Sequence, residues 1–201
     1  MAEKNVVAAV LAGGSGSRLG GDKAAVELAG RPLLCYPVAA VREAGLPLLV
    51  VAKPGTALPP LRAEVVREPS EPVHPLCGVL AALGSGAAQS RPAAVLALAC
   101  DTPFLTAELL AWLAAQDGPV LLEQGGRLQP LPGRYPAVLA PRLEEAVRQG
   151  EPMGRALAAL GARIVGDREL ARFGEPSRLC LNVNEPADLR AAASLLAGTR
   201  G

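Results

Sequence analysis

Residues 6–23, with the sequence VVAAVLAGGSGSRLGGDK, join a continuous apolar run to a glycine-rich loop. Val6–Leu11 carries no polar side chain, which is typical of a strand buried on both faces of a parallel sheet. The loop behind it contains five glycines and ends on Gly-Asp-Lys at position 23. Ligands of open α/β sheets bind beyond the carboxyl ends of the strands, so this loop lies where a binding site is expected.

Strand-like and helix-like patterns alternate over the rest of the chain. Strands are expected at residues 6–11, 46–52, 64–66, 93–101, 119–123, 127–132, 162–165 and 179–184, and helices at residues 32–44, 78–83, 107–116, 141–149, 152–160 and 186–196. Thr106 is the expected N-cap of the third helix. This alternation predicts the α/β class, with a three-layer α/β/α arrangement around a mainly parallel, Rossmann-like sheet. A chain of 201 residues fits a single domain, which we place at residues 1–201.

Half of the residues are apolar and 19% are charged, which is the composition of a packed globular protein. The net charge of +1 offers no general attraction for nucleic acid or for an anionic membrane. No apolar run approaches the roughly 20 residues that a bilayer requires, and no signal peptide is recognised, so we expect a cytoplasmic protein. The four cysteines form no Cys-x-x-Cys pair and are expected to be buried, reduced thiols without zinc or an iron–sulfur cluster.

The glycine-rich loop departs from the two standard phosphate-binding motifs. A dinucleotide fingerprint requires glycine where Leu19 stands, and a P-loop requires Lys-Ser/Thr where Asp22-Lys23 stands. Glycines nevertheless let successive backbone N–H groups converge on one anion. Arg18 adds a planar guanidinium and Lys23 a mobile ammonium, which bind polyphosphate in different ways. We therefore predict a phosphate site, and a solvated surface loop is the alternative.

The segment ALACDTPFL, residues 97–105, places Asp101 at the carboxyl end of a buried strand. A carboxylate in this position can hold Mg²⁺ between a triphosphate and an acceptor phosphate. The alternative is an aspartate that caps a turn before Pro103. Three other motifs follow the loop in the chain: PLCGVLAAL at residues 75–83, RLQPLPGRYP at residues 127–136 and LNVNEPADL at residues 181–189.

The ordered set of these motifs resembles the molybdenum cofactor guanylyltransferase family. The pattern Leu-Ala-Gly-Gly-x-x-x-Arg-Leu-Gly-x-Asp-Lys from Leu11 resembles the signature loop of nucleotidyltransferases, and residues 75–83 resemble the Pro-Leu-Ala-Gly segment that closes over the base. Residues 127–136 resemble the acceptor-side stretch in which Gln/His-Pro-Leu recurs. Residues 181–189 resemble the ending Asn-Val-Asn-Thr-Pro-Glu-Asp-Leu of the guanylyltransferases. The resemblance covers residues 6–190.

The resemblance implies a fold of the nucleotide-diphospho-sugar transferase type, with a nucleotide-binding half at about residues 1–105 and an acceptor-binding half at about residues 106–201. It implies transfer of GMP from GTP to the molybdenum–molybdopterin cofactor, which yields the guanine dinucleotide form and pyrophosphate. The acceptor phosphate attacks the α-phosphorus in line, and no covalent protein nucleophile is needed. Mg²⁺ held by Asp101 is the implied cofactor.

The resemblance also assigns roles to residues. Catalysis and neutralisation of the phosphates fall to Arg18, Lys23 and Asp101. Nucleotide contacts fall to Leu11, Ala12, Gly13, Gly14, Lys23, Glu68, Gly78 and Asp101. Acceptor contacts fall to Gln129, Asn182 and Asn184, although a polar strand end is the alternative for the two asparagines. Many members have asparagine where our alignment places Ala52 and aspartate where Glu68 stands, so the nucleoside contacts are expected to differ here.

Several other functions stay open at this point. Within the superfamily they are a cytidylyltransferase for the same cofactor, or a transferase for a sugar phosphate or phospholactate. A non-catalytic nucleotide-binding regulatory domain is the alternative from another class, and transient docking with molybdenum-insertion proteins or molybdoenzymes is a further role. His74, the single histidine, is interpreted as a surface loop residue flanked by proline, and Trp112 as part of helix packing.

Overall fold

The computed structural model describes residues 5–14, 17–19, 21–85 and 91–198. Its main sheet has seven strands in the order β5-β4-β1-β6-β8-β7-β9. The strands are β1 (Val6–Leu11), β4 (Leu48–Ala52), β5 (Glu64–Arg67), β6 (Ala94–Ala99), β7 (Val120–Gln124), β8 (Arg127–Pro136) and β9 (Arg163–Val165). β8 is antiparallel to both of its neighbours, and the other neighbouring pairs are parallel. The predicted mainly parallel sheet is therefore confirmed.

Strand β1 lies inside this sheet, between β4 and β6. Its side chains from Val6 to Val10 are at most 6% exposed, as expected for an apolar strand that is covered on both faces. Leu11 is in register with Val51 and with Ala99, so the three strands end at one edge of the sheet. The glycine-rich loop leaves β1 at this edge, where the topology predicts a ligand.

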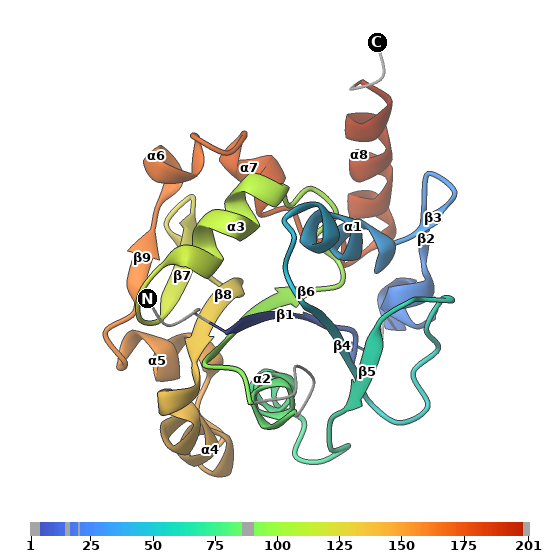
Figure 1. Ribbon diagram of the computed structural model, residues 1–201. Helices are drawn as coiled ribbons and strands as arrows, with labels where there is room; N and C mark the ends of the chain where they lie inside the picture. Colours follow the sequence, from blue (N-terminus) through green and yellow to red (C-terminus); the bar gives the residue numbers. More distant parts are fainter. Residues whose placement is uncertain (1–4, 15–16, 20, 86–90, 199–201) are drawn as a thin grey trace.

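Helices cover both faces of the sheet (Figure 1). The helices α1 (Cys35–Glu43) and α3 (Ala107–Ala115) pack on one face, and α2 (Pro75–Gly84), α4 (Ala140–Arg148) and α5 (Met153–Ala158) pack on the other. Alternate side chains of β1 contribute to one hydrophobic cluster or to the other. The predicted three-layer α/β/α arrangement is confirmed.

Short elements complete the described part of the chain. They are the strands β2 (Glu27–Leu28) and β3 (Arg31–Pro32), the 3₁₀ turns η1 (Ser17–Leu19), η2 (Lys23–Ala25) and η3 (Ala137–Leu139), and the helices α6 (Asp167–Leu170), α7 (Pro176–Leu179) and α8 (Pro186–Ala197). The β2–β3 hairpin was not predicted; its turn residues Ala29 and Gly30 have φ angles of 49° and 78°. α8 projects from the body of the molecule (Figure 1), and Ala192 is the side chain that it buries.

The structure tests two of the predicted helix starts and one predicted strand. The predicted N-cap is confirmed, because the Thr106 hydroxyl accepts a hydrogen bond from the Leu109 N–H at 3.3 Å. Helix α2 begins at Pro75, three residues before the predicted start, because proline is favoured in a first helical turn and the residue before it caps the helix. The predicted strand at residues 179–184 is wrong. The Glu175 carboxylate caps the short helix α7, which ends at Leu179, and residues 181–184 then run without regular secondary structure and do not join the sheet.

Two of the expectations drawn from composition are tested by the structure. Within the described residues, no helix is long and apolar enough to cross a bilayer. All four cysteines are free thiols, of which three are buried and Cys35 is half-buried. The predicted burial is therefore confirmed for three of the thiols and is wrong for Cys35.

Candidate active site

Three polar side chains from distant parts of the chain meet at the carboxyl edge of the sheet. The Lys23 ammonium donates to Oδ2 of Asp101 at 2.5 Å and to Oδ1 of Asn184 at 2.7 Å. The first pair is 78 positions apart in the sequence and the second is 161 positions apart. An ammonium has three N–H donors, so these two contacts within the described residues leave one donor available for a ligand. All three residues were among those predicted.

The backbone holds each of these side chains in place. Asp101 comes two residues after the end of β6, and Lys23 begins the η2 turn, which is anchored by the fully buried Ala24. The residue before the lysine, Asp22, accepts a hydrogen bond from the Ala57 N–H at 2.7 Å, which ties η2 to the loop after β4. The backbone of Lys23 is thus fixed on one side by the buried Ala24 and on the other by the hydrogen bond of Asp22.

Asn184 is positioned by the segment that replaces the expected late strand. The Val183 N–H donates to the backbone oxygen of Asp101 at 2.9 Å, and the Val183 side chain is fully buried. The N–H groups of Asn184 and Glu185 both donate to the Asp188 carboxylate, at 2.9 and 3.0 Å, in the first turn of α8. A capping interaction at the start of α8 therefore fixes the asparagine beside the lysine.

Asp101 is buried, at 7% exposure, and its Oδ1 atom has no hydrogen-bond partner within the described residues. Most buried polar atoms in folded proteins are partnered, so an orphan carboxylate oxygen indicates a group that the protein alone does not supply. Carboxylate and amide oxygens are the ligands that Mg²⁺ prefers. No cluster of three or more histidine, cysteine, aspartate or glutamate side chains that could hold a metal ion is found in the described part of the chain. The unpartnered Oδ1 of Asp101 fits one ligand of Mg²⁺.

A cavity of about 390 Å³ extends from Lys23 and Asp101 along the edge of the sheet. It is lined by Leu11, Gly13, Gly14, Lys23, Lys53, Glu68, Val73, His74, Pro75, Ala99, Cys100, Asp101 and Leu131. Lys23 and Asp101 form one end of the lining, which we call the phosphate end. Glu68 and Lys53 follow β5 and β4 and form the other end, which we call the nucleoside end.

The Glu68 carboxylate lies between two glycines. A Cβ atom built on Gly13 would stand 2.2 Å from its Oε1, and one built on Gly78 would stand 2.9 Å from its Oε2. Glu68 is 8% exposed, and burial raises the pKa of its carboxyl above the ordinary value of 4.5, although the nearby Lys53 ammonium partly lowers it. The two glycines are therefore required by close approach of a carboxylate, which the sequence motif alone did not reveal.

Lys53 is the main cavity residue that sequence reasoning missed. Our alignment placed the departure from the family at Ala52, but Ala52 is fully buried in the hydrophobic core, and Lys53 is the residue that lines the cavity. Lys53 immediately follows β4, next to β1 in the sheet. Lys53 could have been predicted from the rule that ligands bind beyond the carboxyl ends of the strands.

Cys100 also lines the cavity, and burial raises the pKa of its thiol to about 12. A thiol with such a pKa stays protonated at neutral pH, and the thiolate is the nucleophilic form of cysteine.

Other predicted site residues lie elsewhere. Arg18 is exposed on η1 and is not part of the cavity lining. Ala12 is buried, and its N–H donates to the Val51 oxygen within the fold. Gln129 sits in β8 outside the lining, and the Asn182 side chain turns back to donate to the Cys180 oxygen at 2.9 Å. Residues 15, 16 and 20 of the glycine-rich loop lie outside the described residues.

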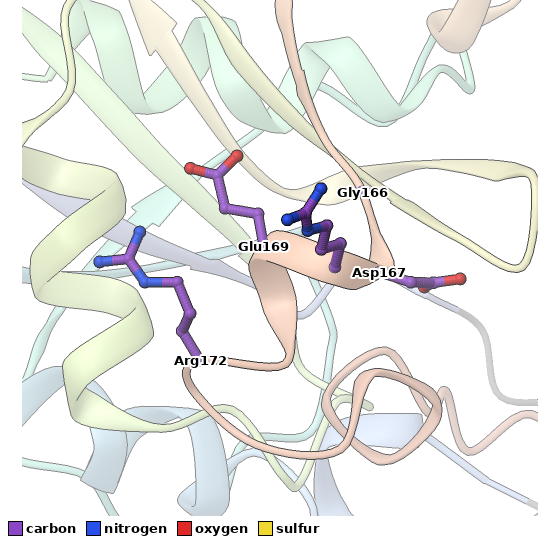
Figure 2. A pocket seen from close by; sticks show the side chains of 5 residues that line it. Gly166, Asp167, Glu169 and Arg172 are labelled. Atoms are coloured by element: carbon purple, nitrogen blue, oxygen red, sulfur yellow. The ribbon is translucent and has the colours of Figure 1, made fainter.

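A second depression, of about 570 Å³, surrounds α6 and is shown in Figure 2. Its lining comes from residues 166–172 alone. Asp167 accepts a hydrogen bond from the Gly125 N–H at 3.0 Å, and Glu169 pairs with Arg163 at 2.6 Å. These carboxylates are engaged in holding α6 to the neighbouring turn and strand, and none of the predicted site residues lies here. The cavity beside Lys23 is therefore the candidate active site.

Comparison with known proteins agrees with this geometry. Residues 8–172 match the model of a family described as the MobA-like NTP transferase domain. The chain belongs to that family. A molybdenum cofactor guanylyltransferase of Cereibacter sphaeroides is 37% identical over 200 residues, which cover 93% of this chain and 95% of that protein. The family expected from the sequence and its nucleotidyltransferase class are thereby confirmed.

Solved structures share the MobA-like fold. Molybdopterin-guanine dinucleotide biosynthesis protein A from Archaeoglobus fulgidus matches with a TM-score of 0.77 at 24% identity, covering 95% of this chain and 98% of that one. A Mycobacterium tuberculosis protein solved in complex with manganese matches with a TM-score of 0.68 at 14% identity, covering 94% of this chain and 98% of that one. These likenesses confirm the predicted nucleotidyltransferase fold.

Proposed function

We propose that this MobA-like protein transfers GMP from GTP to the phosphate of the molybdenum–molybdopterin cofactor. The observation that carries the proposal is the Lys23 ammonium, held between Asp101 and Asn184 at one end of a cavity whose other end presents the Glu68 carboxylate. One end suits the phosphates of a nucleotide and the other suits a base. The names of the curated relatives agree with this activity.

In the proposed reaction, an oxygen of the acceptor phosphate forms a bond to the α-phosphorus of GTP while the bond to the β-phosphate bridging oxygen breaks. Pyrophosphate leaves with the electron pair of that bond. Lys23 keeps two N–H groups on Asp101 and Asn184 and directs the third to a phosphate oxygen, so its orientation is set before the substrate arrives. Positioning and charge neutralisation supply most of the acceleration in such transfers.

A divalent cation completes the proposed site. Asp101 would hold Mg²⁺ through Oδ1, the oxygen that Lys23 leaves unused. When bound, the ion would neutralise charge on the phosphates, which is the usual contribution of Mg²⁺ in phosphoryl transfer. The manganese complex of a fold relative supports a divalent cation in this architecture.

Glu68 is proposed to select the base. A carboxylate accepts two hydrogen bonds side by side, and guanine offers N1–H and the 2-amino group as adjacent donors. Cytosine offers one amino group next to an acceptor nitrogen and so matches a carboxylate less well. The Gly13 and Gly78 positions leave room for this carboxylate at the nucleoside end. Guanine is therefore the base that the cavity favours.

The acceptor side of the proposal rests on fewer contacts. Asn184 adjoins Lys23 and would meet the acceptor phosphate, whereas Asn182 and Gln129 stay predictions as acceptor contacts. Arg18 likewise stays a prediction as a phosphate ligand. The cytoplasmic location and transient docking with molybdenum-insertion proteins or molybdoenzymes are part of this proposal as well.

The test incubates the pure protein with Mg²⁺, the molybdenum–molybdopterin cofactor and each of the four nucleoside triphosphates, and measures pyrophosphate. Release with GTP, and not with the other three, is expected. Release with CTP alone would overturn the base assignment in favour of a cytidylyltransferase. Binding of GTP without release under these conditions would support a non-catalytic nucleotide-binding domain instead.

A further inference from the structure

His74 has a different place in the structure from the surface loop position that the sequence suggested. Its side chain is half-buried, lines the cavity and uses both ring nitrogens. Nδ1 lies 3.1 Å from the Leu76 backbone nitrogen, and Nε2 lies 2.8 Å from the backbone oxygen of Glu151. The second contact joins residues 77 positions apart in the chain.

The two contacts specify one form of the ring. A backbone N–H can only donate, so Nδ1 accepts the hydrogen bond from Leu76 and carries no proton. A backbone oxygen can only accept, so Nε2 carries the proton and donates to Glu151. His74 is therefore a neutral imidazole with two separable tasks: Nδ1 caps α2, and Nε2 bridges α2 to the connection between α4 and α5.

Both ends of this bridge are built into the fold. On one side, Pro75 lines the cavity, and a Cβ atom built on Gly78, in the first turn of α2, would stand 2.9 Å from the Glu68 carboxylate. On the other side, the Glu151 N–H donates to the Ala146 oxygen at 2.9 Å, and the Glu151 side chain accepts a hydrogen bond from Arg142 at 2.8 Å. The backbone carbonyl of Glu151 is thus held in place opposite α2, the helix that forms one wall of the nucleoside end.

We propose that His74 is a positioning residue for nucleotide binding: its Nε2 bridge to Glu151 holds the first turn of α2 at the distance from Glu68 that the base requires. The inference rests on the proposed function in that GTP is the nucleotide bound. Small displacements of positioning groups have large effects because the contacts at a binding site depend steeply on distance. The bridge acts on GTP affinity, and the reacting atoms lie at the other end of the cavity.

Two amide substitutions separate the bridge from the cap. In His74→Asn, the amide oxygen takes the place of Nδ1, so the cap persists and the bridge is lost; asparagine is among the favoured N-cap residues. In His74→Gln, the longer amide reaches the place of Nε2, so the bridge persists and the cap is lost. His74→Ala removes both. If His74 acts only through the cap, GTP binding should be weaker in the glutamine variant. If it acts through the bridge, GTP binding should be weaker in the asparagine variant.

The experiment measures binding of GTP with Mg²⁺ by calorimetry in the absence of acceptor, together with kcat and KM for GTP. His74→Asn is expected to weaken GTP binding about fivefold, the size of one hydrogen bond, and to raise KM in proportion while kcat changes less than about twofold. His74→Gln is expected to bind GTP within about twofold of the wild type. An asparagine variant with wild-type affinity, or a glutamine variant as weak as His74→Ala, would overturn the proposal.

The opposite anchor gives a second measurement. Arg142→Ala loosens Glu151 and is expected to weaken GTP binding about twofold in the wild-type background but not in His74→Asn, because the bridge is already absent there. Arg148→Ala, which breaks the exposed pair with Glu145 on the same helix, is the matched control and should leave affinity unchanged. Additive effects of the Arg142 and His74 substitutions would contradict the bridge. A wild-type protein that binds GTP but releases no pyrophosphate would contradict the proposed function and leave the His74 comparison intact.

Discussion

The two ends of the cavity handle charge in opposite ways. At the phosphate end, Lys23 and Asp101 are paired at 2.5 Å, and Asn184 satisfies a second donor of the ammonium. At the nucleoside end, the Glu68 carboxylate is buried between Gly13 and Gly78, and its pKa is raised because burial outweighs the attraction of Lys53. The side chains of the phosphate end are therefore paired with one another without a ligand. At the nucleoside end, burial destabilises the charged form of Glu68 until a ligand donates hydrogen bonds to it.

This difference assigns different roles to the two ends. Groups that are held rigidly where charge develops lower the barrier, because they need no reorganisation during the reaction. A buried carboxylate that lacks strong partners gains most from a ligand that donates to it, and it therefore contributes to affinity and selectivity. Substitutions at the phosphate end should change kcat, and substitutions at the nucleoside end should change the affinity for GTP.

The largest effect is expected from Asp101→Asn. The substitution keeps the shape of the side chain but removes the negative charge that pairs with Lys23 and that would attract Mg²⁺, because a neutral amide replaces the carboxylate. Pyrophosphate release should fall by about 10³-fold. Circular dichroism should show an intact fold, and a variant with near-normal turnover would contradict the role of Asp101.

Lys23→Ala should follow, with a loss of about 10²-fold in kcat, because one preorganised donor to the phosphates is removed. The affinity for the base should change little. Lys23→Gln serves as the control for folding, since its amide can still donate to the buried Asp101 carboxylate. A decrease in kcat of less than threefold would contradict a catalytic role for the phosphate end.

Glu68→Gln should weaken GTP binding by about tenfold, the size of a hydrogen bond to a charged group, and should leave kcat nearly unchanged. An amide offers only one acceptor where guanine needs two. Calorimetric titration with GTP and with CTP measures the change in both affinity and preference. If the preference for GTP over CTP survives the substitution in full, Glu68 does not select the base.

Gly13→Ala and Gly14→Ala form a matched pair that tests the tight packing around Glu68. A Cβ atom at position 13 would meet the Glu68 carboxylate, whereas one at position 14 meets no atom of the described residues within 4 Å. The first substitution should lower the free energy of unfolding by about 1 kcal/mol, because the carboxylate must shift. The second should leave stability unchanged within experimental error. Thermal unfolding without ligand distinguishes them, and equal behaviour of the two variants would argue against the close approach.

The smallest effect concerns pH. Burial raises the pKa of Glu68 in the folded protein above 4.5, so the folded state binds this proton more tightly than the unfolded state does. The contribution of Glu68 to stability is therefore present below pH 4.5 and is lost as the pH rises through the folded pKa. Glu68→Gln lacks this contribution, so its melting temperature should rise relative to the wild type as the pH increases from below 4.5 through the folded pKa of Glu68. A difference that does not vary with pH would contradict the raised pKa.

The fold could be predicted largely because the central strands β1, β4 and β6 are apolar along their whole length. Residues 179–184 were mistaken for a strand because their alternation of apolar and polar side chains is also produced by a loop that buries Val183 against a helix. Local pattern does not say whether a neighbouring strand is present to pair with an extended segment.

The site could be predicted where a motif marks it and not where contacts between distant residues decide it. Lys23 and Asp101 follow from the glycine-rich loop and from the end of a buried strand. Asn182 and Asn184 looked equivalent in sequence. Contacts of Val183 with the Asp101 backbone and of the Asn184 N–H with Asp188 direct Asn184 to the lysine. Lys53 and His74 belong to no motif. Their neighbours in the cavity are distant in the sequence, so the sequence alone does not show that they line it.

The attachment of Asn184 to α8 has a consequence for how the enzyme responds to heat. α8 projects from the body (Figure 1), buries a single side chain, Ala192, and yet its first turn fixes the asparagine through Asp188. Segments with little buried surface open locally at a lower free-energy cost than the core of a protein. Fraying of α8 on warming would release Asn184 from Lys23 while the sheet stays folded. Activity is then lost below the temperature at which the domain melts.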